Sequence, residues 1–211
     1  MGKIDKGILG GFSGTVGTVV GGTWKGIAYM RSKASGSRSA SSPLQLDQQA
    51  RFSTTIKFLQ PMTSLLNVSF REYAVKMTGI NNAMSYTLKN AISGTYPAYT
   101  VDYSMALVSR GDLPNAMAPA ATTTGTDVLY TWTPNAGVGK AGATDKAILA
   151  VYCAARQQCI FTTIGPDRST GAATLDVTPF AGQTVQTYIG FITADGRDIS
   201  NSFYTGELTI S

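Results

Sequence analysis

The stretch TLDVTPFAGQTVQTYIGF, residues 174–191, carries the pattern that decides the fold predicted for the second half of the chain. Two runs rich in β-branched and aromatic residues flank a turn sequence that contains Pro and Gly. The pattern recurs around it and gives seven candidate strands, at residues 101–108, 127–133, 146–154, 158–164, 172–178, 184–193 and 202–210. Short strands separated by turn sequences are typical of a β-sandwich. We therefore predict an antiparallel β-sandwich, immunoglobulin-like or fibronectin III-like, over residues 99–211.

Residues 41–98 have a helical pattern instead. Ser42 can cap a helix, and Pro43 suits its first position. Apolar residues then follow at helical spacing up to Pro61, which ends or kinks the run. A second apolar stripe comes after this proline, and we predict a third short helix over residues 81–92, capped by its first residue.

Residues 1–40 form a glycine-rich segment. The sequence GTVGTVV (14–20) predicts a strand, Gly21-Gly22 a two-residue turn, and residues 23–31 the return strand. Residues 32–42 have the composition of a linker. A lone hairpin is marginally stable in water, so we expect it to pack on its own chain or on a neighbouring copy.

Alternation along the return strand predicts two different faces. It puts Ile27, Tyr29 and Arg31 on one face and Trp24 with Met30 on the other. The whole chain is thus predicted to be α+β, with three parts: a basic hairpin arm and linker (1–40), a helical segment (41–98) and a sandwich (99–211).

The composition argues against an enzyme. The 211 residues contain no histidine, which removes the commonest general base and metal ligand. The two cysteines, Cys153 and Cys159, cannot complete a four-ligand zinc site. We interpret them as reduced thiols, with a disulfide between adjacent strands as the alternative. We predict no catalytic residue, no bound cofactor and no metal.

No phosphate-binding motif accompanies the glycines. The sequence contains neither GxxxxGK[ST] nor a GxGxxG between a strand and a helix. Several carboxylates lie at predicted turns, where Asp accepts hydrogen bonds from the local backbone: Asp112, Asp127, Asp145, Asp195 and Asp198. None forms a pair suited to acid–base chemistry, and no serine stands in GxSxG.

The uncharged run Gly7–Trp24 has the length of a membrane span but not its hydropathy. Seven of its 18 residues are glycine, which leaves too little apolar surface to hold it in lipid. The N-terminal sequence also lacks the apolar core and cleavage site of a signal peptide. We predict no membrane span, and we leave localisation open, with the cytoplasm or a virion favoured.

Positive charge is concentrated in the first part of the chain. Residues 1–40 hold six basic residues and one acidic residue, whereas residues 111–211 hold five basic and eight acidic residues. Opposite charge at the two ends suits head-to-tail packing of copies. With the nearby aromatic rings, four cations could also contact a nucleic acid: Lys25, Arg31, Lys33 and Arg38. A solvated hairpin and linker explain the same residues, so nucleic acid is the less favoured partner.

The stretch 174–191 resembles the late strands of fibronectin type III-like domains. In that family a Leu-x-Val-x-Pro sequence leads into a strand with a buried tyrosine, here Tyr188, and an early strand carries a tryptophan, here Trp132. The resemblance covers about half of the chain, and the long 134–145 loop departs from the compact form. It implies a sandwich of the kind used as a binding or spacer module.

The whole chain resembles an uncharacterised family of Bacteroidota-type bacteria and their mobile elements, which is known only as a domain of unknown function. The sequences that carry this resemblance include GILGGFSGTVGTVV (7–20) and GFITADGRDISNS (190–202). The family brings no activity with it.

We therefore expect a non-enzymatic, self-assembling structural protein of virion or filament type that forms homo-oligomers. The residues expected to make the subunit contacts belong to the arm: Gly14, Gly17, Gly21, Gly22, Trp24 and Tyr29. One alternative is a nucleic-acid-associated protein that uses the basic arm. Another is a sandwich adhesin or ligand-binding module that uses its loops.

Overall fold

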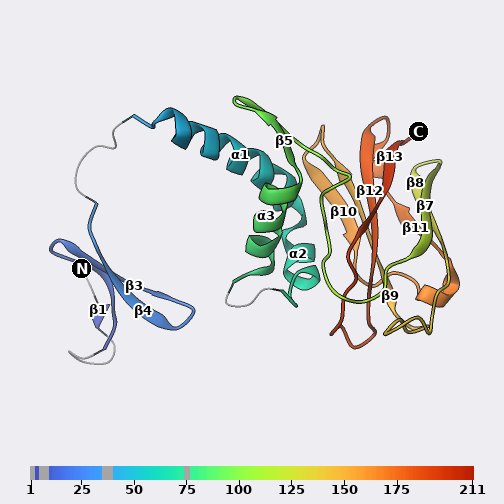
Figure 1. Cartoon of the computed structure of the whole chain (residues 1–211), viewed down its shortest axis with the longest axis horizontal. Coiled ribbons are helices and arrows are strands. Elements are labelled where there is room, and N and C mark those ends of the chain that lie inside the picture. The colour runs from blue at the N-terminus through green and yellow to red at the C-terminus, as the bar shows by residue number, and fades with distance from the viewer. Residues whose placement is uncertain (1–2, 5–9, 35–39, 74–76) are drawn as a thin grey trace. The chain divides into compact units, whose positions relative to one another are not determined.

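A computed structural model of the chain describes residues 3–4, 10–34, 40–73 and 77–211. The chain divides into two compact units, Met1–Ser42 and Pro43–Ser211, which Figure 1 draws in blue and in cyan to red.

The second unit begins with helices. They are α1 (Pro43–Leu59), α2 (Thr63–Ser69) and α3 (Gly79–Asn90), with a 3-10 turn, η1 (Gln60–Met62), after α1. Pro43 occupies the first position of α1, as predicted, and Pro61 lies in η1, where α1 ends. The third helix begins two residues earlier than predicted. Its cap is Thr78, whose hydroxyl accepts a hydrogen bond from the Asn81 N–H at 3.4 Å, and not Asn81 itself.

A short hairpin follows the helices and packs along α1. It consists of β5 (Ile92–Thr95) and β6 (Ala98–Val101). The Tyr99 hydroxyl donates a hydrogen bond to the Asp47 carboxylate. The Arg51 guanidinium lies 5.2 Å from the centre of the Tyr99 ring. These polar contacts tie the hairpin to the first half of α1.

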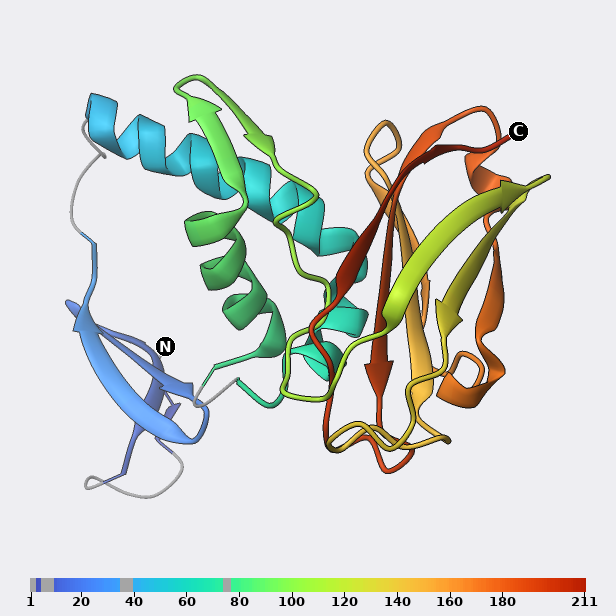
Figure 2. The same cartoon turned by 45° about the vertical axis from the view of Figure 1, so that its right-hand side comes forward.

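Two antiparallel sheets complete the second unit. The larger sheet has the order β10-β9-β12-β13 and contains β9 (Lys146–Cys153), β10 (Gln158–Thr162), β12 (Thr184–Ile192) and β13 (Phe203–Thr209). The smaller sheet has the order β11-β8-β7 and contains β7 (Met117–Thr124), β8 (Asp127–Thr133) and β11 (Ala172–Asp176). Figure 2 shows the helices on one side of the larger sheet and the smaller sheet on the other. The predicted α+β fold with an antiparallel sandwich is confirmed.

The central strands β9 and β12 are buried on both faces. Along β9, Ile148, Ala150 and Tyr152 belong to the core beneath the helices, while Leu149 and Val151 belong to the core between the sheets. This alternation follows the two-residue period of a strand. The nearly continuous apolar sequence of β9 thus reflects two cores rather than one.

The two aromatic residues singled out by the fibronectin resemblance are both buried. Trp132 lies between the sheets, and its indole N–H donates to the Arg168 carbonyl at 2.8 Å. Tyr188 lies beneath the helices, and its hydroxyl donates to the Tyr103 carbonyl at 2.8 Å. They therefore serve different cores.

Two strand predictions differ from the structure. Residues 101–108 form no strand beyond Val101, because the Asp102 carboxylate accepts a hydrogen bond from the Ser104 N–H at 3.0 Å and starts a turn. Strand β7 is absent from the predicted strands because its sequence, MAPAATTT, lacks alternation and contains Pro119. The structure accommodates this proline on an edge strand, beside a register shift.

The first unit is a four-stranded antiparallel sheet, which we call the glycine-rich sheet. Its order is β1-β2-β3-β4, with bounds β1 (Lys3–Ile4), β2 (Phe12–Val16), β3 (Val19–Trp24) and β4 (Ile27–Ser32). The predicted hairpin of residues 14–20 and 23–31 is wrong: a turn at Gly17-Thr18 divides the first strand into β2 and β3, and the hairpin that forms, β3–β4, turns at Lys25-Gly26. Gly21-Gly22, predicted as the turn, lies inside β3 opposite Met30 and Tyr29.

Candidate functional site

Gly21 and Gly22 hold aromatic rings against the glycine-rich sheet. A Cβ on Gly21 would overlap the Phe12 carbonyl oxygen and lie 2.6 Å from the Phe12 ring, and a Cβ on Gly22 would lie 3.0 Å from the Tyr29 ring. Tyr29 stands directly opposite Gly22. An aromatic ring over a glycine in the neighbouring strand replaces the missing side-chain packing. The sheet itself therefore requires these glycines, and they do not form a turn.

Gly14 and Gly17 support the backbone of the same sheet. Gly14 lies in β2 with φ 101°, and Gly17 begins the turn after β2 with φ 59°. Both values lie in the region that favours glycine. The two residues thus shape the sheet, and their part in a subunit contact stays a prediction.

The Lys25-Gly26 turn decides which side chains share a face. Their φ angles are 47° and 81°, the two positive values of a type I′ turn. Trp24 lies directly opposite Ile27 across this turn, so both project from one face, and alternation adds Tyr29 and Arg31 to it. We call these four residues the aromatic–basic face. The prediction that Trp24 lies on the opposite face is wrong, because the Lys25-Gly26 turn interrupts the alternation between Trp24 and Ile27.

The aromatic–basic face and the strand β4 are exposed. Trp24 is 54% exposed, and every residue of β4 is exposed, with Ile27 at 69% and Met30 at 71%. Of the described residues in this unit whose burial is given, Gly21 alone is buried. Apolar side chains on an unpaired edge strand offer a template for pairing with another chain.

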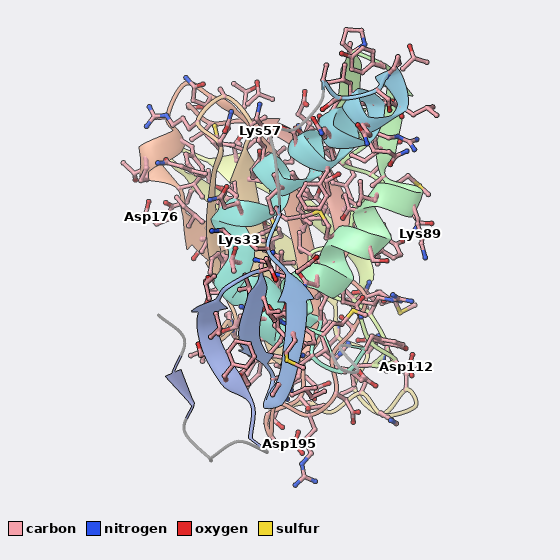
Figure 3. The ribbon with its side chains drawn as sticks, turned by 90° about the vertical axis from the view of Figure 1, so that its left-hand side faces the viewer. Lys33, Lys57, Lys89, Asp112, Asp176 and Asp195 are labelled. Carbon is pink, nitrogen blue, oxygen red and sulfur yellow. The ribbon has the colours of Figure 1, made fainter. Side chains whose placement is uncertain are left out.

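Three of the four predicted nucleic-acid contacts lie along the same hairpin. Arg31 belongs to the aromatic–basic face, and Lys25 places its ammonium 5.2 Å from the centre of the Trp24 ring. Lys33, labelled in Figure 3, follows directly after β4. Arg38 lies outside the described residues.

A second candidate region lies beside the edge strand β10 of the second unit. A cavity of about 580 Å³ is lined by α1, η1, β10 and the 3-10 turn η3 (Thr178–Phe180). A cavity of about 400 Å³ shares Lys57 and Gln157 with it and is lined by aromatic residues, among them Tyr103 and Tyr152. Lys57, labelled in Figure 3, is the one charged residue in either lining. The residues that line these cavities lie far apart in the sequence, so no local sequence pattern predicts the cavities.

A buried ion pair closes one end of the sandwich. Arg168 Nε lies 3.1 Å from Asp145 Oδ2, and their side chains are 0% and 4% exposed. The guanidinium also donates to Asn135 Oδ1 at 2.8 Å and to the Pro114 carbonyl at 2.9 Å. Asp145 accepts from the Gly142 N–H at 2.9 Å, as a turn aspartate should. This pair joins three loops and is a structural feature rather than a reactive one.

The two cysteines are free thiols. Cys153 belongs to the core between the sheets, and Cys159 packs against the core beneath the helices. They therefore lie on opposite faces of one sheet. Burial raises the pKa of the Cys159 thiol to about 12, which keeps it protonated and unreactive at neutral pH.

Within the described ranges, no three His, Cys, Asp or Glu side chains come close enough together to hold a metal ion. No helix in that part of the chain combines the length and the hydropathy that a bilayer crossing needs. The carboxylates Asp112 and Asp195 lie toward one end of the second unit and Asp176 toward the other (Figure 3).

Comparison with known proteins gives a family but no activity. Residues 11–206 match the family described as "Family of unknown function (DUF6266)". No curated protein matches the chain. Among solved structures, the chain is similar to the fn3 domain of human collagen alpha-1(XX) chain, with 15% identity and a TM-score of 0.34, over 49% of this chain and 91% of that one.

Proposed function

Because the chain belongs to DUF6266, a family of unknown function, we propose a function from its own geometry: a non-enzymatic structural protein that self-assembles through the glycine-rich sheet. A virion or a filament is the kind of assembly it would build. The family membership agrees with the resemblance noted in the sequence, and the Bacteroidota-type origin stays a prediction.

The observation that carries the proposal is the exposure of β4. Ile27 and Met30 are 69% and 71% exposed. Within the described residues, β4 pairs with β3 alone, so the backbone groups on its other edge have no partner there. In water such an edge favours association. The unit that holds it has little core of its own, so a subunit contact would stabilise it.

Charge makes assembly between copies dependent on salt. Residues 1–42 hold six basic residues and one acidic residue, while residues 43–211 hold eleven of each. Identical first units repel one another over long distances, but salt screens exposed charges within about 8 Å at physiological ionic strength. We therefore expect assembly to strengthen as the salt concentration rises.

Light scattering on the full chain tests the proposal. We expect an oligomer that falls to a monomer in the double variant Ile27→Asn/Met30→Asn. The matched control, Leu44→Asn/Ile164→Asn, removes two apolar side chains of the second unit that are 80% and 81% exposed, and it should leave the mass unchanged. A full-length monomer over a wide concentration range would sink the proposal.

A nucleic-acid-associated protein is the second candidate, favoured by one observation. The turn brings Trp24 and Tyr29 onto the same face as Arg31, so two rings and a cation could meet one strand of nucleic acid. The affinity for single-stranded DNA should then fall steeply as the salt concentration rises. Arg31→Gln should reduce the slope of log K against log salt concentration by about the amount expected for one phosphate contact. Binding that is absent at low salt would remove this candidate.

A ligand-binding module is the third candidate, and the two cavities beside β10 favour it. Their lining carries one cation and no carboxylate, which suits a neutral ligand or one with a single negative charge. Exchange of the 134–145 loop tests the loop version of this idea, and Lys57→Ala tests the cavity version. If the affinity for a bound small molecule is unchanged in the loop exchange and in Lys57→Ala, neither the loop nor the cavities form the binding site.

A further inference from the structure

The hydrogen bonds of β4 determine which of its peptide groups face outward. The Lys33 N–H donates to the Thr18 carbonyl at 2.7 Å, so residue 33 points toward β3. Peptide groups in an antiparallel strand alternate between facing the partner and facing away. Residues 27, 29 and 31 therefore face β3, and Ala28, Met30 and Ser32 present their N–H and C=O groups at the free edge.

This free edge is long enough and regular enough to receive a strand. Among the described residues, the order β1-β2-β3-β4 leaves β4 at the border of the sheet, and its pairing with β3 is continuous from Ile27 to Ser32 without a register shift. No proline interrupts it. Two of the devices that block an edge, a bulge and a proline, are absent from β4, and its one charged residue is Arg31.

A second copy of the chain is the partner whose chemistry fits this edge. A two-fold axis perpendicular to the sheet sets β4 antiparallel to its counterpart, and each residue then contacts a residue of its own strand in the other copy. Several registers of this pairing are possible, and each is defined by the residue of β4 that lies on the two-fold axis. The registers differ in which charged side chains they place opposite each other.

One register satisfies every outward group without a charge conflict. With Met30 on the axis, Ala28 lies opposite Ser32 of the second copy, so all three outward residues find partners. Tyr29 then lies opposite Arg31, where a guanidinium can stack on the ring. Ile27 lies opposite Lys33, whose aliphatic stem can cover it.

The neighbouring registers are poorer. With Ser32 on the axis, Arg31 lies opposite Lys33 and two like charges meet, which is destabilising. With Ala28 on the axis, Met30 falls opposite Gly26 in the turn, and Ser32 loses its partner. With Tyr29 on the axis, Ser32 falls opposite Gly26.

We propose that two copies join β4 to β4 in antiparallel register about a two-fold axis at Met30, which makes one continuous sheet across the contact. This inference rests on the proposed self-assembly and specifies its geometry. The pairing is closed and isologous, so it yields a dimer, and a larger assembly would need a second contact elsewhere on the chain.

Cross-linking of the full chain tests the register. Residues on the axis form a hydrogen-bonded pair with Cα atoms about 5.5 Å apart, within the range of about 4.4–6.8 Å that a disulfide spans. Mild oxidation of Met30→Cys should therefore give a covalent dimer at least tenfold faster than oxidation of Tyr29→Cys, whose own counterpart is displaced by two residues to about 7–8 Å. The unsubstituted chain, with its two packed thiols, supplies the background rate.

A second variant tests the free edge without a disulfide. Ser32→Pro removes an outward N–H and leaves the hydrogen bonds to β3 in place, so the dissociation constant of the dimer should rise at least tenfold. Ser32→Ala keeps the N–H and should have no effect.

The outcomes separate this inference from the proposed function. An oligomer by light scattering with no preference for Met30→Cys, or with equal effects of the two Ser32 variants, would overturn the β4 pairing and leave self-assembly standing. A monomer at all concentrations would overturn both.

Discussion

Arg168 is the largest side chain that the second unit buries completely. Its guanidinium lies over the Phe191 ring at 3.9 Å and pairs with Asp145. Burial lowers the pKa of Arg168, and the Asp145 carboxylate opposes that shift. Because an arginine stays charged at ordinary pH, the stability of the folded second unit depends on the pairing of Arg168 with Asp145.

We expect Arg168→Met to lower the free energy of unfolding by about 3–5 kcal/mol, because Asp145 would stay buried without its counter-charge. Urea-induced unfolding measures this loss. The control is Arg197→Met, which removes an exposed arginine 3.4 Å from Asp195 and should cost about 1 kcal/mol or less. Equal losses in the two variants would contradict a structural role for the buried pair.

The Cys159 thiol predicts a loss of stability at alkaline pH. Burial raises its pKa from 9.0 to about 12, so the folded chain retains a proton that the unfolded chain has released. Its contribution is therefore fully present below pH 9 and is lost as the pH rises toward 12. We expect the free energy of unfolding to fall by at most about 1.4 kcal/mol per pH unit between pH 9 and 10.

The variant Cys159→Ala should show a flatter profile over the same interval. Burial also raises the pKa values of Tyr130 and Tyr188, whose own effects begin near pH 10, so the comparison is made below that pH. Identical slopes in the two proteins would refute the assignment.

At the scale of the element, the β3–β4 turn is the most informative. Gly26 has φ 81°, and a Cβ added there would meet no atom within 4 Å, so a substitution changes mainly the backbone strain. Asn adopts this conformation readily, whereas a β-branched residue does not. Gly26→Val should therefore destabilise the hairpin by about 1 kcal/mol relative to Gly26→Asn.

Amide hydrogen exchange in β3 and β4 measures this difference. The Asn variant should keep the exchange rates of the native hairpin, while the Val variant should exchange several-fold faster. A slower exchange in the Val variant would mean that the turn is not of type I′.

The same elements show what could be predicted from the sequence. Strands such as 127–133 and 184–193 were predictable because alternation and turn residues agreed with tertiary burial. The β7 strand was not, since Pro119 and its alanines gain strand structure only from the neighbouring strand. The sequence predicts a turn at Gly21-Gly22 wrongly, because glycine favours both tight turns and positions under an aromatic ring, and local sequence does not separate the two. The Arg168–Asp145 pair and the cavities beside β10 join residues far apart in the chain, so no local pattern could indicate them.

At the scale of the molecule, the two units differ in how they are held together. Both hydrophobic cores are formed by residues of the second unit, from Ile56 onward. We therefore expect a chain that begins at Pro43 to keep its free energy of unfolding within about 0.5 kcal/mol of the full chain. Urea unfolding followed by tryptophan fluorescence of Trp132 measures this. A loss above about 2 kcal/mol would show that the first unit contributes to the core.

The position of α1 has a consequence for mechanical load. In any assembly held by the first unit, tension would reach the second unit through residues 33–42 and enter it at Pro43. Residues 43–54 of α1 include no buried side chain, and the contacts of Asp47 and Arg51 with Tyr99 are polar. The first half of α1 would therefore peel away and lengthen before either hydrophobic core is strained, so each subunit of such an assembly would carry its own extensible tether.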